Sequence, residues 1–147
     1  MKVLKTLFFV VFGLAVIAVG GFAYLGQTSK SGKALGLTQG QLVPCPASPN
    51  CVSSEAGTEP DKRVEAFALG AWGRLPAAIA EMGGTIIVSD EDYIAAEFTS
   101  STFGFVDDVE FRLAEDAVQA RSASRVGYSD AGVNAARIEE LRSKVAQ

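Results

Sequence analysis

Histidine is absent from this 147-residue sequence, and only two cysteines, Cys45 and Cys51, are present. Histidine is the commonest general base and the commonest zinc ligand, so a hydrolytic or metal site would need carboxylates, hydroxyls or these two thiols. The residues between the cysteines fit neither a redox motif nor a zinc motif. We therefore expect no metal site and no cofactor.

Acidic side chains are missing from the first 54 positions, where all the charge comes from Lys2, Lys5, Lys30 and Lys33. The part from Ala34 onward carries nine basic and 17 acidic residues, which gives a net charge of −8. An acidic domain repels phosphate backbones, so nucleic acid is excluded as an expected partner.

Charge is also missing between Lys5 and Lys30, where the stretch Thr6–Ser29 is dominated by Leu, Phe, Val, Ile and Ala. As a helix with a rise of ~1.5 Å per residue, this stretch of 24 residues would span about 36 Å. The hydrocarbon core of a bilayer is ~30 Å thick. The sequence therefore predicts an anchor over residues 1–29, with the membrane as a partner through Thr6 to Ser29.

The same segment also has features of a cleaved signal peptide. Ala18-Val19-Gly20 and Gly21-Phe22-Ala23 resemble weak cleavage sites behind a short basic start. The apolar run continues beyond them, however, and Tyr24 lies where an interfacial aromatic residue is expected. We favour a retained anchor.

Lys2 and Lys5 precede the helix and Lys30 and Lys33 follow it, so the positive-inside count is close to a tie. A short head with two lysines usually stays in the cytoplasm, which favours a domain on the extracytoplasmic side.

The cysteines enclose a proline-rich, turn-prone loop. In an oxidising compartment, Cys45 and Cys51 would form a disulfide that stabilises the fold by about 2 kcal/mol. In the cytoplasm they would remain free thiols. The extracytoplasmic location favours the disulfide.

The remaining sequence divides into a linker and one folded unit. Residues 30–43 are rich in Gly, Ser, Thr, Gln and Lys, which is typical of a flexible linker. Residues 44–147 form a single α+β domain, expected as a four-stranded antiparallel sheet packed against two helices. The predicted strands are Thr85–Ser89, Tyr93–Thr99, Phe103–Leu113 and Val118–Val126, with Val64–Leu69 as a further candidate, and the predicted helices are Ala71–Met82 and Asn134–Val145.

A turn after Ala114 sets the register of the last predicted hairpin, so that Glu110 faces Arg121 and Asp108 lies diagonal to Arg125. Strand alternation puts these four side chains on one face of the sheet. One interpretation is a solvated face with ion pairs worth a few tenths of a kcal/mol each. The other is an anion-binding face, because arginine side chains fit carboxylate or phosphate oxygens.

Three segments together carry a family resemblance. They are CPASPNCVSS at 45–54, FVDDVEFR at 105–112, and RSASRVGYSD at 121–130 with NAARI at 134–138. The chain from about Pro44 to Arg142 resembles family 1499 of the domains of unknown function. The resemblance implies a small domain often found behind an N-terminal membrane segment or signal, and it implies no activity. Its motif positions coincide here with Cys45, Cys51, Asp107, Asp108, Arg121, Ser122, Ser124, Arg125, Tyr128 and Asp130.

These observations favour a non-catalytic, membrane-tethered binding or assembly module with an anionic ligand or an envelope protein as its partner. The expected ligand-binding residues are Arg121, Arg125, Asp108, Glu110, Tyr128 and Asp130. A hydrolase with Asp107 or Asp108 as general base and an arginine at the oxyanion is one alternative. A structural envelope component is the other.

Overall fold

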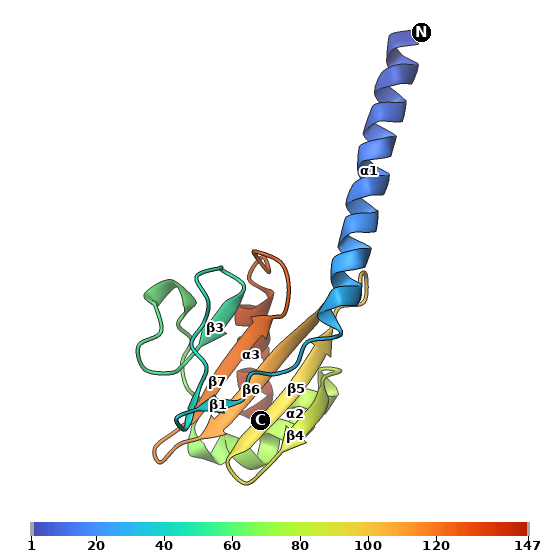
Figure 1. Cartoon of the computed structure of the whole chain (residues 1–147). Helices are drawn as coiled ribbons and strands as arrows, with labels where there is room; N and C mark the ends of the chain where they lie inside the picture. Colours follow the sequence, from blue (N-terminus) through green and yellow to red (C-terminus); the bar gives the residue numbers. More distant parts are fainter. Residues whose placement is uncertain (1, 147) are drawn as a thin grey trace.

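The computed structural model describes residues 2–146, so Met1 and Gln147, the outer ends of the predicted anchor and domain, lie outside the described part. Helix α1 (Lys2–Ser29) projects away from an α+β domain, and most of its apolar side chains are exposed (Figure 1). Among the described residues, α1 is the one helix long and apolar enough to cross a membrane. Its length and composition agree with the predicted anchor, and equally with a signal sequence.

The main sheet has five antiparallel strands in the order β3-β7-β6-β5-β4. They are β3 (Cys51–Ser53), β4 (Thr85–Ser89), β5 (Tyr93–Thr99), β6 (Val106–Leu113) and β7 (Val118–Ser124). The four predicted strands are confirmed as β4 to β7. The count of four is wrong, because β3 adds a fifth strand at the edge of β7. Three residues after a proline-rich turn give too short a pattern for strand alternation to reveal.

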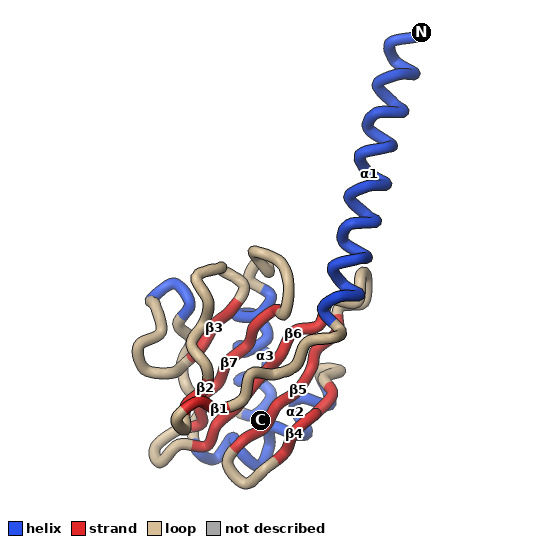
Figure 2. Tube along the Cα trace, viewed as in Figure 1, coloured by secondary structure: helices blue, strands red, loops and turns tan. Residues whose placement is uncertain are grey.

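Helices α2 (Leu75–Glu81) and α3 (Val133–Val145) pack on one face of the sheet, as predicted (Figure 2). Alternate strand residues point toward these helices and form a single apolar core with them. Its fully buried members include Leu75, Ile79, Phe111, Ile138 and Leu141.

The first predicted helix begins differently from its expected start at Ala71. A 3₁₀ helix, η2 (Leu69–Arg74), runs directly into α2, and a shorter one, η1 (Pro60–Lys62), lies further upstream. The α-helix proper starts at Leu75 because Pro76 has no N–H to donate and is tolerated only in the first turn.

The candidate strand Val64–Leu69 is wrong. The described backbone there is irregular apart from one bridge between Phe67 and Val118 and the start of η2. Phe67 is nevertheless buried in the core, where its ring meets that of Phe111 edge-on at 5.6 Å between centroids. The apolar pattern therefore reports burial of this segment and not its backbone conformation.

Residues 30–46, here called the covering segment, cross the sheet face that is opposite the two helices (Figure 1). The segment includes the short strands β1 (Leu37–Thr38) and β2 (Gln41–Leu42), which pair only with each other. Leu42 is buried and belongs to a small apolar cluster with Tyr93 on β5. The stretch 30–43, expected as a flexible linker, thus lies against the domain.

The last turn of α1 is part of the same packed structure. The Ser29 hydroxyl accepts a hydrogen bond from the Val106 backbone N–H at 3.0 Å, and the Ser29 carbonyl accepts one from Arg125 at 3.2 Å. A Cβ added at Gly26 would lie 1.9 Å from the Phe103 carbonyl oxygen, so only glycine fits there. The helix therefore enters the domain without an intervening hinge.

Replacing Gly26 with alanine is expected to open this junction, since the added methyl collides with backbone at a cost of about 1–3 kcal/mol. The readout is the rate of tryptic cleavage after Lys30 in the full chain in detergent micelles. A local opening of that size accelerates cleavage on the order of tenfold. Gly20→Ala is the matched control, because a Cβ there meets nothing within 4 Å. Equal rates in the two variants would contradict the packing described here.

Candidate functional site

The sheet face opposite the helices is polar but shielded from solvent. Glu110 pairs with Arg121 across β6 and β7, and Asp108 pairs with Ala123, which confirms the predicted register. The interpretation of a solvated face is wrong: Glu110 is 0%, Arg121 4% and Asp108 5% exposed. The covering segment removes this face from water. The ion pairs there consequently act in a low-dielectric environment, where each unpaired charge is costly.

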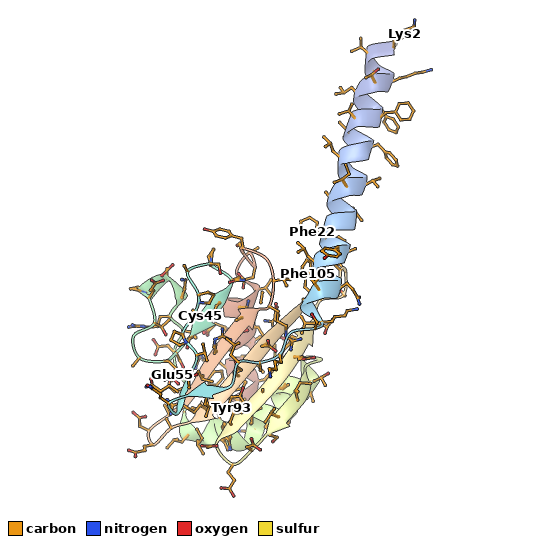
Figure 3. The ribbon with its side chains drawn as sticks, in the orientation of Figure 1. Lys2, Phe22, Cys45, Glu55, Tyr93 and Phe105 are labelled. Carbon is orange, nitrogen blue, oxygen red and sulfur yellow. A yellow bond between two sulfur atoms is a disulfide. The ribbon has the colours of Figure 1, made fainter. Side chains whose placement is uncertain are left out.

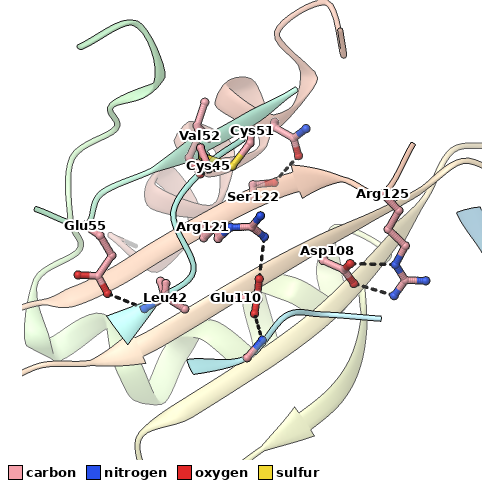
Figure 4. Close-up of polar contacts among 12 residues, drawn as sticks. Leu42, Cys45, Cys51, Val52, Glu55, Asp108, Glu110, Arg121, Ser122 and Arg125 are labelled. Atoms are coloured by element: carbon pink, nitrogen blue, oxygen red, sulfur yellow. Dashed lines mark hydrogen bonds and ion pairs between the residues drawn. A yellow bond between two sulfur atoms is a disulfide. The ribbon is translucent and has the colours of Figure 1, made fainter. Parts of the chain in front are cut away.

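Glu110 is the centre of one buried network (Figure 4). Its Oε2 accepts a hydrogen bond from Arg121 at 2.8 Å, and its Oε1 accepts from the Tyr93 hydroxyl at 2.7 Å and the Gly36 backbone N–H at 2.8 Å. Burial, together with the neighbouring Glu110 carboxylate, raises the pKa of Tyr93 well above its ordinary value. Tyr93 therefore keeps its proton and remains a hydrogen-bond donor to Glu110.

Arg125 is the centre of a second network beside the end of α1. Its guanidinium donates two hydrogen bonds to Asp108, at 2.8 and 2.7 Å, and a further one to Glu97. A fourth goes to the Ser29 carbonyl at 3.2 Å. These contacts use each of its nitrogens, so Arg125 holds β5, β6, β7 and α1 together.

A cavity of about 440 Å³, here called the basic hollow, lies between the covering segment and β7. Lys33 and Pro44 line it from the covering segment, and Asp108, Arg121 and Arg125 line it from the sheet. Its charged lining residues are three basic groups against one carboxylate, although the domain as a whole is acidic. Arg121 is paired with Glu110, and Arg125 with Asp108 and Glu97, so within the described chain the positive charge of the hollow that no carboxylate balances is that of Lys33.

One hydrogen-bond donor of the Arg121 side chain has no acceptor. Its Nη1 donates to Glu110, but its Nε is buried and has no hydrogen-bond acceptor. Within the part of the chain that the structure describes, this is the only buried side-chain nitrogen or oxygen in that condition. A buried donor without a partner costs about 1–3 kcal/mol.

Tyr128 and Asp130 lie elsewhere, in a separate cavity where α1 meets the domain. The Asp130 carboxylate accepts hydrogen bonds from the backbone N–H groups of Gly132, at 3.0 Å, and Asn134, at 2.7 Å. Burial opposes the charge of Asp130, but these hydrogen bonds hold its pKa below the ordinary value. Of the six expected ligand-binding residues, the structure therefore brings together Asp108, Arg121 and Arg125, with Glu110 contacting Arg121.

Asp107 and Asp108 point to opposite faces of the sheet, as adjacent strand residues must. Asp107 lies on the helix side and pairs with Arg137 at 2.7 Å, whereas Asp108 pairs with Arg125. Each is thus neutralised by its own arginine. Among residues 2–146, no three acidic or cysteine side chains converge in an arrangement that could hold a metal ion.

Several polar residues of the site were not anticipated. Tyr93 and Glu97 follow from the same alternation that located Glu110, since Glu97 pairs with Asp108 across β5 and β6. Extending the register argument by one strand identifies both. Lys33 has no such signal, because nothing in a Gly- and Ser-rich stretch indicates that it folds back on the sheet.

Cys45 and Cys51 form a disulfide, as predicted (Figure 4). Cys51 begins β3 and pairs with Ala123 of β7, while Cys45 lies between Pro44 and Pro46, which both line the basic hollow. The bond therefore fixes this wall to the sheet edge. By the loop-entropy estimate it contributes about 2 kcal/mol to stability.

Comparison with models of protein families gives a match to this chain. A family model described as "Protein of unknown function (DUF1499)" matches residues 41–145, which include the disulfide loop, the sheet and both helices of the domain. No curated protein and no solved structure matches the chain.

Proposed function

This chain belongs to the DUF1499 family of proteins of unknown function, and we propose that it is a membrane-tethered binding module whose basic hollow holds a small anion. The anchor is α1, and the domain stands on the extracytoplasmic side. The ligand is a phosphate or carboxylate group, received between Arg121 and Lys33.

The unpartnered Nε of Arg121 is the observation that carries this proposal. A guanidinium presents its donors in a planar fork that matches anion oxygens, and Arg121 has committed only Nη1 to Glu110. An anion oxygen at Nε would supply the missing acceptor. Lys33, exposed on the opposite wall, would add a second positive charge within the same hollow.

Two features support the membrane tether and its side. Residues 6–29 are uncharged, and most of the apolar side chains of α1 are exposed, whereas its last turn packs on the domain (Figure 3). Disulfides persist in oxidising compartments, so the Cys45–Cys51 bond favours a domain outside the cytoplasm.

Binding is favoured over hydrolysis because the two carboxylates considered as general bases are both engaged. Asp107 pairs with Arg137, and Asp108 accepts two hydrogen bonds from Arg125. A general base needs to reach a substrate proton, and these oxygens are directed at guanidinium groups.

Isothermal titration of the full chain in detergent micelles with inorganic phosphate tests the proposal. Arg121→Lys keeps the charge opposite Glu110 but lacks the Nε donor, so we expect an affinity loss of at least about tenfold. Lys33→Ala should weaken binding by up to about fivefold, since the lysine is exposed.

Lys30→Ala is the matched control for Lys33→Ala, because Lys30 is also exposed at the start of the covering segment but does not line the hollow. It should bind phosphate like the unchanged chain. Sodium acetate in place of phosphate distinguishes a carboxylate site from a phosphate site. The proposal fails if neither anion binds, or if Arg121→Lys binds as tightly as the original.

A further inference from the structure

A second cavity, here called the junction hollow, lies where α1 meets the domain and has a volume of about 460 Å³, within the range of small-molecule sites. Its lining comes from three separate parts of the chain. Phe22 and Leu25 belong to α1, Phe105 and Val106 lie where the β5–β6 loop enters β6, and the far wall comes from the loop after β7 and Val133 at the start of α3.

Aromatic rings join the helix to the domain at this point (Figure 3). Phe22 stacks on Phe103 with 5.5 Å between ring centroids and meets Phe105 edge-on at 6.4 Å. Phe103 and Phe105 also contact each other edge-on at 6.3 Å. Phe22 and Phe105 therefore line the α1 side of the junction hollow, and Phe103 packs against both rings.

The carboxylates in this cavity are already satisfied. Asp107 is paired with Arg137, and Asp130 accepts two backbone N–H groups at the start of α3. The other side chains of the far wall are mainly apolar, and two of them are unusually accessible. Tyr128 is 77% exposed and Val133 50% exposed, which leaves an apolar surface at the entrance without a protein partner.

We propose that the junction hollow receives the acyl chain of a lipid from the bilayer that α1 crosses. Phe22 and Leu25 continue the apolar surface of α1 directly into the cavity, so a chain lying along the helix can enter without passing through water. Burial of apolar surface from both the chain and the cavity drives the binding. The inference rests on the membrane part of the proposed function but not on the basic hollow.

Photolabelling tests this site. The full chain is reconstituted in phosphatidylcholine vesicles that contain a lipid with a diazirine near the end of its acyl chain, irradiated, and digested with trypsin. We expect adducts on two tryptic peptides, 6–30 from α1 and 126–137 from the far wall. The peptide 113–121 spans the β6–β7 turn, which lies at the end of the sheet remote from α1 (Figure 1), and measures background.

Val133→Asp introduces a charge at the half-exposed rim and should reduce labelling of 126–137 to background, while 6–30 stays labelled. Ile87→Asp is the matched control: Ile87 is 54% exposed on β4 and lines neither hollow. It should leave both adducts unchanged.

Three outcomes overturn the inference. The first is labelling of 6–30 with only background on 126–137, and the second is equal labelling of 126–137 in Val133→Asp and the original chain. The third is no labelling of 6–30, which also refutes the membrane tether of the proposed function. Phosphate titration is independent of all three, so failure of the basic hollow remains distinguishable.

Discussion

Arg121→Met is expected to destabilise the full chain by about 3–5 kcal/mol, because it leaves a buried carboxylate without its counter-charge. Glu110 is completely buried, and Arg121 supplies the only positive group among its hydrogen-bond partners in the described chain. Tyr93 and Gly36 would still donate to Glu110, but two neutral donors do not compensate a buried negative charge.

A double variant separates charge from packing. Arg121→Met combined with Glu110→Gln removes both charges and keeps an amide oxygen for Tyr93 and Gly36, so most of the lost stability should return. Unfolding is followed by Trp72 fluorescence in a denaturant titration in non-ionic detergent. Similar stability of Arg121→Met and the original chain would contradict the buried pair.

Charge reversal at Arg121 is a poor test of anion binding for the same reason. A glutamate there would face Glu110 in a buried site, and loss of binding could not be separated from loss of folding. The Arg121→Lys variant avoids this ambiguity because its ammonium keeps the pair with Glu110.

Leu42→Ala is expected to lower the free energy of unfolding by about 2–4 kcal/mol, as for other buried leucines. Leu42 is 2% exposed and packs from the covering segment onto Tyr93 and Ala95 of β5. Its backbone N–H also donates to Glu55, whose carboxylate is held in turn by two hydrogen bonds from Arg112. Loss of the side chain should therefore loosen the covering segment as well as leave a cavity.

Leu35→Ala is the matched control for this change. Leu35 lies in the same segment but is 58% exposed, so its truncation should alter the free energy of unfolding by no more than about 0.5 kcal/mol. The free energy of unfolding of both variants is measured by Trp72 fluorescence in the same denaturant titration. Equal effects of the two substitutions would show that residues 30–43 form the flexible linker that the sequence predicts.

Strand alternation and turn position were sufficient to predict strands β4 to β7 and the pairing of the charged residues on β6 and β7. The pairing of Glu110 with Arg121 follows from the position of the turn between β6 and β7. A register shift of a single residue would move every side chain of the strand to the other face of the sheet. Alternation does not reveal what covers that face. For this reason the sequence predicts which charged side chains share this face of the sheet, but it does not predict that they are buried.

The covering segment could not be predicted because its position depends on contacts with residues distant in the sequence. Its strands have two residues each, and they are joined by a turn in which Gln39 and Gly40 both adopt positive φ. The hydrogen bond from Gly36 to Glu110 crosses 74 positions of sequence. The sequence of a Gly-rich stretch of this kind is the same whether it forms a flexible linker or a segment packed on a sheet.

The separation of the expected site into two hollows has a similar cause. Tyr128 and Asp130 were expected in one site with Arg125 because all three coincide with motif positions of the family resemblance, and both follow β7 closely in sequence. The chain turns away after the strand, and Asp130 begins the turn that leads into α3. Loop direction is set by such local hydrogen bonds, so proximity along the chain does not place side chains in one cavity.

The hinge-free entry of α1 into the domain restricts where the domain can work. Ser29 is held by Val106 and Arg125, and Gly26 lies flush against the backbone of residue 103. If α1 crosses a bilayer as proposed, a globule mounted in this way keeps one side turned toward the lipid headgroups and cannot sweep through the space above them. Under that proposal the domain would serve molecules that come to the bilayer surface and would not reach out to collect distant ones.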